Sequence, residues 1–157
     1  HLVSNLTLLE NILVAGYVSK KFSPQEVQQR AAELLRQMGV ESAKDRLPTQ
    51  VSGGEAQRAA IARAMISKPG LLFADEPTGA LNRSSSEDVL NLLTQLHIDG
   101  QSIVMVTHDA KAALRGNRIL YLEDGKILDE IKLPCYGSDN LKQREETVTR
   151  WLSHLQW

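Results

Sequence analysis

The stretch "LLFADEP" at residues 71–77 decides the fold, because it joins a short apolar run to two neighbouring acids. Such a run is typical of a buried strand in a parallel sheet, whose carboxyl end opens onto a site. The stretch "SIVMVTH" at residues 102–108 has the same form. Four apolar residues of the segment between them share one helical face: Val89, Leu92, Leu93 and Leu96. The sequence therefore predicts a strand, a helix and a second strand, joined by a parallel crossover.

Two helices are predicted before this unit. Ser23 and Glu26 have the spacing of a capping box, and Pro24 suits the first helical position. Apolar residues then recur at helical spacing until Gly39 ends the run. A second helix is predicted from about residue 55 to residue 67, directly after a pair of glycines.

A hairpin and a last helix are predicted after this unit. The stretch "NRILYLEDGKILDEI" at residues 117–131 holds two alternating segments around Asp124 and Gly125, the strongest short signal for a hairpin turn. The tail from Ser138 onward has the pattern of an amphipathic helix. Its apolar side consists of Leu141, Val148, Trp151, Leu152 and Leu155.

Composition excludes several classes of protein. A length of 157 residues suits one ordinary domain, and a net charge of -1 gives no overall attraction to nucleic acid or to an anionic membrane. A single cysteine, Cys135, cannot form an intramolecular disulfide and fits a reducing compartment. The apolar opening carries Glu10 and Asn11 and lacks a basic start, so it fits neither a signal peptide nor a membrane span.

Asp75 and Glu76 are candidate catalytic or metal-binding residues. Two adjacent carboxylates at the end of an apolar strand are costly to bury unless they bind something. Neighbouring side chains of a strand point to opposite faces. One carboxylate can therefore hold Mg²⁺ while the other orients or deprotonates a water molecule. The alternative is a surface turn whose acids are only solvated.

His108 ends the second predicted strand, at the position that Asp75 and Glu76 occupy on the first. Since the carboxyl ends of parallel strands lie at one edge of a sheet, His108 is expected to reach the same site. One alternative is a histidine that only packs or caps. Another is a helix start at "VTHD" with Asp109 as its cap, which is compatible with the site.

The stretch "VSGGE" at residues 51–55 introduces a helix-forming run with two glycines, Gly53 and Gly54. Glycine lets an anion approach the N–H groups at a helix start, where the helix dipole also favours negative charge. Yet the lysine-bearing phosphate loop, G-x-x-x-x-G-K-[ST], occurs nowhere in the 157 residues. Either the glycines have no part in phosphate binding, or the phosphate is supplied from elsewhere.

Taken in order, "VSGGEAQRAAIARAM", "LLFADEPTGALN" and "VTHD" resemble the C-terminal two-thirds of an ATP-binding cassette (ABC) transporter ATPase. The resemblance covers residues 1 to about 131. It implies an α/β fold, the C-terminal part of a P-loop NTPase cassette with a mainly parallel sheet, flanking helices, a helical subdomain and a C-terminal hairpin plus helix. It also implies a helical subdomain at 1–66, a core at 67–131 and a helical tail at 132–157.

The resemblance assigns a nucleotide-binding role to Ser52, Gly53, Gly54 and Glu55, which match the family's signature loop. In a head-to-tail dimer this loop closes on the γ-phosphate of an ATP molecule that the partner's Walker A loop holds. Glutamine often stands at the last of these positions in the family. Glu55 instead adds a negative charge near the expected phosphate, which the helix dipole alone would not favour.

The resemblance also assigns roles to residues at the ends of the two predicted strands and in the turn that follows the first strand. Asp75 and Glu76 match the Walker B residues that support Mg²⁺ and polarise the attacking water. His108 matches the switch histidine that contacts the γ-phosphate. Residues 79–82 match the D-loop, and Asn82 replaces an aspartate that is frequent there, which keeps a hydrogen-bonding side chain without the charge.

Cofactors and partners also follow from the resemblance. It implies ATP and Mg²⁺, a second ATPase subunit, a transmembrane permease contacted near residues 1–12, no nucleic acid, and a place at the cytoplasmic face of the cell membrane. The Walker A loop, the adenine-stacking aromatic residue and the Q-loop glutamine have no counterpart in the sequence. We therefore expect a truncated cassette that neither binds nor hydrolyses ATP alone.

Within the family, the chain resembles ATPases of lipoprotein-releasing and macrolide exporters. "DEPTGALN" and the tryptophan-bearing tail are most similar to bacitracin-type transporters for antimicrobial-peptide resistance. Two alternatives remain at the sequence level. One is a non-transport member of the superfamily that acts on nucleic acid, which the net charge of -1 disfavours. The other is an inactive structural or interaction domain, against which the intact acids and histidine argue.

Overall fold

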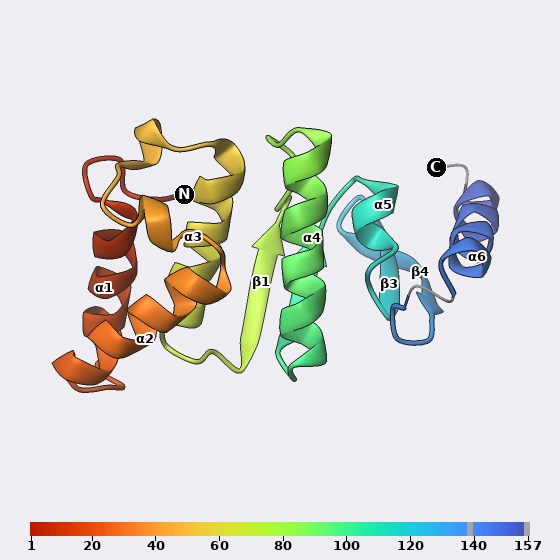
Figure 1. Ribbon diagram of the computed structural model, residues 1–157. Coiled ribbons are helices and arrows are strands. Elements are labelled where there is room, and N and C mark those ends of the chain that lie inside the picture. Colours follow the sequence, from red (N-terminus) through yellow and green to blue (C-terminus); the bar gives the residue numbers. More distant parts are fainter. Residues whose placement is uncertain (138–139, 156–157) are drawn as a thin grey trace. The chain divides into compact units, whose positions relative to one another are not determined.

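The computed structural model describes residues 1–137 and 140–155, and the chain forms two compact units, His1–Met105 and a second that begins at Val106 (Figure 1). The first unit contains α1 (Leu8–Ser19), α2 (Pro24–Gln37), two short 3-10 turns (Glu41–Ala43 and Pro48–Gln50), α3 (Gly53–Met65), β1 (Leu71–Asp75), α4 (Arg83–Ile98) and β2 (Ser102–Val106), whose last residue falls at the boundary. The second contains α5 (Ala110–Ala113), β3 (Arg118–Glu123), β4 (Lys126–Lys132) and α6 (Leu141–His154). This order of elements confirms the predicted α/β class. The predicted subdomain boundaries after residues 66 and 131 follow motifs rather than compactness, and they stay a prediction.

Three helices of the first unit begin with the same device. A hydroxyl residue accepts a hydrogen bond from the N–H three residues later, and the glutamate at that later position accepts one in return. These capping boxes pair Thr7 with Glu10, Ser23 with Glu26, and Ser52 with Glu55. Each satisfies N–H groups that a helix start otherwise leaves without a partner. The predicted helix that begins at Pro24 is confirmed.

The helices α1, α2 and α3 pack closely around a shared apolar core. Its fully buried large side chains in these helices and in the segments directly after α2 and α3 are Leu8, Ile12, Val27, Leu35, Met38, Val40 and Ile66. Gly16 of α1 allows the closest approach, because a Cβ atom there would lie only 2.5 Å from Cγ1 of Val27. Asn11, 2% exposed, donates to the carbonyl oxygens of three residues in the segment before α1. That segment is therefore fixed to the helix.

The predicted strand, helix and strand are present as β1, α4 and β2, and the two strands are neighbours in one sheet. Leu72, Ile103 and Met105 pack against the helical core from one face of this sheet. The prediction that β1 is buried was wrong for the other face, since Leu71 is 42% and Phe73 is 73% exposed. The reason is that the sheet has only two strands in the part of the chain that the structure describes, and the helices of the first unit cover one face.

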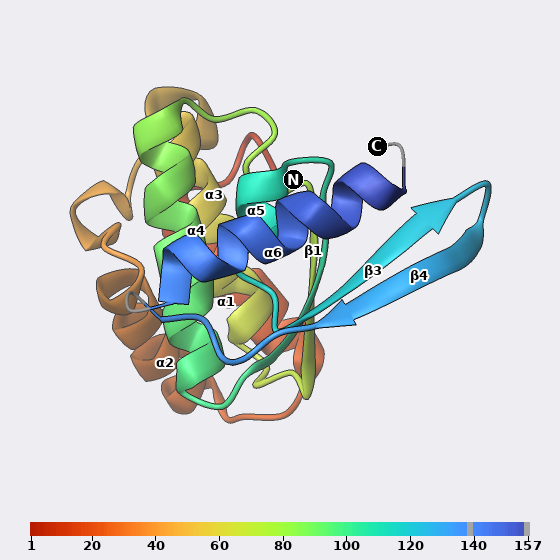
Figure 2. The ribbon, with the colours of Figure 1, turned by 90° about the vertical axis from the view of Figure 1, so that its right-hand side faces the viewer.

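The second unit is a hairpin and a helix, as predicted, although the predicted start of the tail at Ser138 lies outside the described residues. The strands β3 and β4 pair antiparallel, and the turn residues Asp124 and Gly125 have φ angles of 49° and 74° (Figure 2). Both values lie in the left-handed region that this turn requires. The ring of Trp151 in α6 stands edge-on to Tyr121, 6.5 Å between centroids, and its Nε1–H donates to Oδ2 of Asp129 at 2.8 Å.

Arg144 of α6 joins the parts of the second unit. Its side chain is buried, and its guanidinium donates to the carbonyl oxygens of Leu114, Gly116 and Pro134. Burial lowers the pKa of this guanidinium from its usual value. The sequence pattern placed apolar residues on this side of the helix and missed the arginine, because nothing in the sequence reveals three converging carbonyl groups. Among the described residues, none of the helices combines the length and apolar character needed to cross a bilayer.

Candidate functional site

The glycine pair lies inside α3 rather than before it. The sequence predicted a helix from about residue 55, but α3 begins at Gly53 with Ser52 as its N-cap. The prediction was wrong by two residues because it overlooked a second S-x-x-E capping box, formed by Ser52 and Glu55, although the same pattern had located the start of α2. Gly53 and Gly54 therefore occupy the first turn.

The cap at Ser52 is held by three short hydrogen bonds. The Glu55 N–H donates to Oγ of Ser52 at 3.2 Å, while the backbone N–H and the hydroxyl of Ser52 donate to Oε2 of Glu55 at 2.8 and 2.7 Å. These two donors hold the pKa of Glu55 below its usual 4.5. The carboxylate of Glu55 therefore binds the backbone N–H of Ser52, within the segment of residues 52–55.

The N–H groups of Gly53 and Gly54 remain available for an anion. The first N–H groups of a helix have no acceptor within the helix. Oγ of Ser52 accepts a hydrogen bond from the N–H of Glu55, and the carbonyl oxygen of Ser52 accepts one from the N–H of Ala56. Neither glycine N–H donates to an acceptor in the part of the chain that the structure describes. With the positive end of the α3 dipole behind them, these groups can bind a phosphate oxygen.

Both glycines also have a packing role that the sequence did not indicate. A Cβ atom on Gly53 would lie 3.1 Å from Cδ2 of Leu81, and one on Gly54 would lie 3.0 Å from both Cβ and Oγ of Ser85. The start of α3 therefore contacts the start of α4 directly. Sequence reasoning included Leu81 in the D-loop range 79–82 but missed its contact with Gly53, and it missed Ser85 altogether. The signal available was the glycine pair itself, since glycine permits a close approach of backbone.

Asn82 caps α4, its side-chain oxygen accepting the Ser85 N–H at 2.9 Å. The helices α3 and α4 thus begin side by side, and β1 runs toward the end of the unit at which they begin (Figure 1). Two helix N-termini and one strand carboxyl end therefore lie at the same side of the first unit. A side with two positive dipole ends favours an anion.

Asp75 and Glu76 follow at the end of β1. Asp75 is exposed, and Glu76 has a φ angle of 42°, in the left-handed region that glutamate rarely adopts. The N–H of Gly79 donates to the carbonyl oxygen of Glu76 at 3.1 Å and closes the turn. A strained backbone at a polar residue is frequent where a side chain must be aimed for function. Lys20, Lys68 and Asp124 also have left-handed φ angles, so the roles of Asp75 and Glu76 stay a prediction beside the alternative of a plain surface turn.

A magnesium ion fits this donor set. Mg²⁺ is usually held by one or two carboxylates together with phosphate oxygens and water, rather than by a cage of protein ligands. Asp75 offers an exposed carboxylate of this kind. Across residues 1–137 and 140–155, no cluster of three or more His, Cys, Asp or Glu side chains could form a cage by itself.

His108 is exposed and belongs to the second unit, where it precedes the short helix α5. The helix start at "VTHD" is confirmed, because the side chain of Asp109 accepts the N–H of Lys111 at 2.9 Å and caps α5. Oγ1 of Thr107 accepts the N–H of Asp109 at 3.0 Å, which shapes the chain on both sides of the histidine. The role of His108 stays a prediction.

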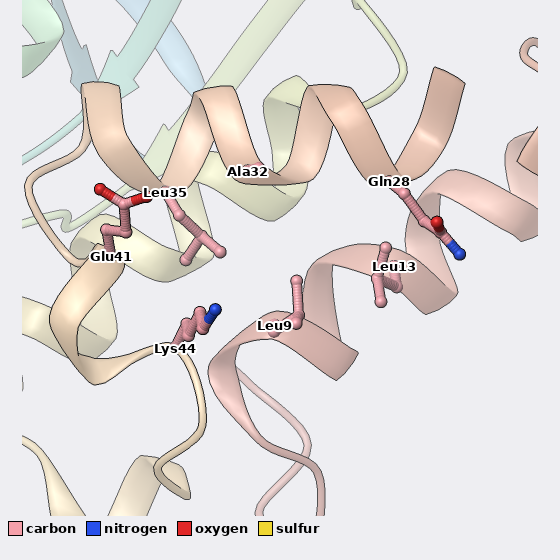
Figure 3. Close-up of a pocket in the computed structure, with 7 residues that line it drawn as sticks. All are labelled: Leu9, Leu13, Gln28, Ala32, Leu35, Glu41 and Lys44. Carbon is pink, nitrogen blue, oxygen red and sulfur yellow. The ribbon is translucent and has the colours of Figure 1, made fainter. Parts of the chain in front are cut away.

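A cavity of about 330 Å³ lies in the first unit (Figure 3). It is lined by Leu9 and Leu13 of α1, Gln28, Ala32 and Leu35 of α2, and Glu41 and Lys44 beyond α2. None of the predicted nucleotide-binding residues lines it. The candidate site is formed by the starts of α3 and α4 and the end of β1.

The cap at Ser52 predicts a dependence of stability on pH. Because the pKa of Glu55 is lowered in the folded chain, its contribution is complete above the usual value of 4.5 and is lost as pH falls through the folded pKa. We expect Glu55→Gln to be less stable than the wild type at neutral pH, with the difference shrinking well below pH 4.5. Urea unfolding at both pH values measures this. Glu33→Gln, on the exposed side of α2, is the control; a gap that does not shrink in acid contradicts the cap.

The ABC transporter family profile matches residues 1–79. The macrolide export ATP-binding/permease protein MacB of Mannheimia succiniciproducens is 43% identical over 148 residues, which is 94% of this chain and 23% of that protein. The lipoprotein-releasing system ATP-binding protein LolD of Francisella tularensis is 42% identical over 128 residues, 81% of this chain and 55% of that protein.

A solved structure gives the same picture. The ATP-binding cassette MJ0796, described as a dimeric post-hydrolysis state bound to ADP and Pi, superposes with a TM-score of 0.74 and 38% identity. The match covers 87% of this chain and 60% of that one. The chain thus spans less than two-thirds of the length of each of these three proteins.

Proposed function

This chain belongs to the ABC transporter family, and from that premise we propose that it is part of an ATPase subunit that powers an exporter. One observation carries the proposal: the free N–H groups of Gly53 and Gly54 lie beside the capped start of α4, at the side toward which β1 runs. A phosphate bound there meets two helix dipoles.

In the proposed mechanism the Ser52 loop completes a site whose other half holds the nucleotide. The N–H groups of Gly53 and Gly54 donate to the γ-phosphate of an ATP on the partner subunit. The hydroxyl of Ser52 also turns toward the phosphate, which requires it to leave Oε2 of Glu55. Glu55 keeps its bond to the Ser52 N–H, so that it binds nucleotide only indirectly, by holding the loop.

The remaining residues act on the nucleotide of their own subunit. Glu76 orients and polarises the attacking water, and His108 contacts the γ-phosphate. Asp75 would hold Mg²⁺, and a bound Mg²⁺ would supply charge neutralisation at the phosphate oxygens. Asn82 fixes the start of α4 beside the dimer contact and offers no charge there. Phosphoryl transfer of this kind depends mostly on positioning and charge neutralisation, which explains the need for donors from several loops.

The partner that we propose for α1 is a transmembrane permease. Val14, Tyr17 and Val18 are exposed on this helix at positions three and four residues apart, so they share one apolar face. Leu9 and Leu13 of the same helix line the 330 Å³ cavity. An apolar face beside a hollow suits a helix of another protein. Contact with a permease would hold the chain at the cytoplasmic face of the membrane.

The proposed cargo is a peptide, lipid or antibiotic. The related proteins are named for macrolide export and lipoprotein release, which supports export in general. The bacitracin-type assignment rests on "DEPTGALN" and the tail, and it is the narrower proposal. The alternatives of a nucleic-acid ATPase and of an inactive interaction domain have no specific observation in their favour.

The 157 residues alone should not retain ATP. Three charge-assisted hydrogen bonds from the Ser52 loop contribute about 1.5–3 kcal/mol each. Association itself costs about 4 kcal/mol or more. The remainder is at most about 5 kcal/mol, which corresponds to a Kd of roughly a few tenths of a millimolar at best.

Hydrolysis of ATP tests this function. We expect turnover by the assembled transporter that carries this chain, and none by the purified 157-residue polypeptide, because the latter has no phosphate-binding lysine loop. Phosphate release is measured for both, with Glu76→Gln as the background. Glu76-dependent hydrolysis by the polypeptide alone would contradict the composite site. Absence of hydrolysis by the assembled transporter would contradict the function.

A further inference from the structure

The first turns of α3 and α4 are in contact at residues that have small side chains or none. Gly54 is buried, and a Cβ atom added to it would lie 3.0 Å from both Cβ and Oγ of Ser85, closer than ordinary van der Waals contact. The neighbouring Gly53 approaches Leu81 in the same way, at 3.1 Å. The two helices can come this close only because glycine faces serine.

Ser85, in the first turn of α4, is also hydrogen-bonded to the segment that follows β1. Its N–H donates to Oδ1 of Asn82 at 2.9 Å. One step back, the N–H of Leu81 donates to the carbonyl oxygen of Thr78 at 3.0 Å, and that of Gly79 to the carbonyl oxygen of Glu76 at 3.1 Å. A series of contacts therefore runs from the glycine pair through Ser85 to the turn that carries Glu76.

We propose that Ser85 is a positioning residue that sets the distance between the Ser52 loop and the Glu76 turn. The inference rests on the proposed function, in which the Ser52 loop faces the partner's nucleotide and Glu76 faces its own. Ser85 then links the two nucleotide sites of the dimer through a single chain. Its side chain touches neither nucleotide; it acts through the first turn of α3.

The size of the side chain at position 85 is the property that matters. Alanine retains the Cβ atom and removes only Oγ, so Ser85→Ala keeps the approach to Gly54. Valine adds two branched methyl groups with little freedom at χ1, and overfilling a close contact forces the backbone apart. Ser84 offers a matched control, since it is exposed in the same first turn and Ser84→Val changes helix propensity equally.

Hydrogen exchange of the 157-residue polypeptide tests the contact without any activity. In Ser85→Val the N–H groups of Glu55 and Ala56 should exchange about fivefold faster or more, because the smallest usual cost of overpacking corresponds to about that factor. Ser84→Val and Ser85→Ala should leave them unchanged. Ser85→Thr, which adds one methyl group, replaces the valine variant if that variant does not fold. Unchanged exchange in the enlarged variant overturns the proposal.

ATP hydrolysis by the assembled transporter tests the positioning role. We expect Ser85→Val to lower kcat about tenfold or more while KM for ATP changes less than about twofold, because ATP is first bound by the partner's half of the site. If Ser85→Val only destabilised the protein, kcat would fall in proportion to the folded fraction. It would then return to the wild-type value at a lower temperature, at which the variant is folded. Wild-type kcat in Ser85→Val overturns the positioning role and leaves the proposed function intact. An inactive wild type overturns the proposed function, whereas the exchange result still decides the contact.

Discussion

Replacing Glu76 by Gln is expected to lower the ATP turnover of the assembled transporter about 10²–10⁴-fold, the range by which a positioned general base contributes. Glutamine keeps the size of the side chain and its hydrogen-bonding oxygen, but it cannot take a proton from water. The turn should persist, because its closing bond comes from the backbone of Gly79. Phosphate release and ATP binding are measured on the same preparation.

The binding measurement distinguishes catalysis from folding. Glu76→Gln should bind ATP as the wild type does, since the γ-phosphate is held by other groups. Glu87→Gln serves as the control, because it removes an exposed carboxylate from the first half of α4. If Glu76→Gln retained more than half of the wild-type turnover, Glu76 would not be the group that activates water.

Replacing Gly16 by Ala should destabilise the 157-residue polypeptide markedly. A Cβ atom at this position would lie 2.5 Å from Cγ1 of Val27 and 3.0 Å from Cγ1 of Ile66. Valine in a helix has one preferred χ1 rotamer, so Val27 cannot turn aside. Overpacking costs about 1–3 kcal/mol, and the helix propensity of alanine returns at most about 1 kcal/mol, so unfolding should become easier by about 1–2 kcal/mol.

Urea unfolding measures this change as a lower midpoint at constant slope. Gly70→Ala is the matched control, because no atom lies within 4 Å of the Cβ that it adds. The control should stay within about 0.5 kcal/mol of the wild type. Equal midpoints for the two variants would mean that α1 and α2 pack less closely than described.

Local sequence signals predicted most of the elements correctly. The capping box at Ser23 located α2, the Asp124 and Gly125 pair located the hairpin turn, and Asp109 was identified as a helix cap. These signals are reliable because each depends on hydrogen bonds or φ angles within a few residues of chain. The same logic would have started α3 at Gly53, had the box at Ser52 been recognised.

The sequence proposes the candidate site as a set of residues, but it does not reveal how they are arranged. The glycine pair has two roles. It presents N–H groups at the start of α3, and it allows α4 to approach closely; only the structure reveals the second role. The left-handed backbone of Glu76 leaves no trace in the residue types around it. The exposure of Phe73 was missed because an apolar strand has the same composition whether or not both of its faces are covered.

The hydrogen bonds of the buried Arg144 determine which positions of the second unit can be substituted during evolution. All three of its acceptors are backbone carbonyl oxygens, at Leu114, Gly116 and Pro134. Every amino acid supplies that oxygen, so the three positions are free to drift in side-chain identity. The arginine is not, since lysine presents a point charge in place of a planar fork. Among sequences that descend from this one, we expect arginine to be retained at position 144, whereas the residues that supply the three carbonyl oxygens vary.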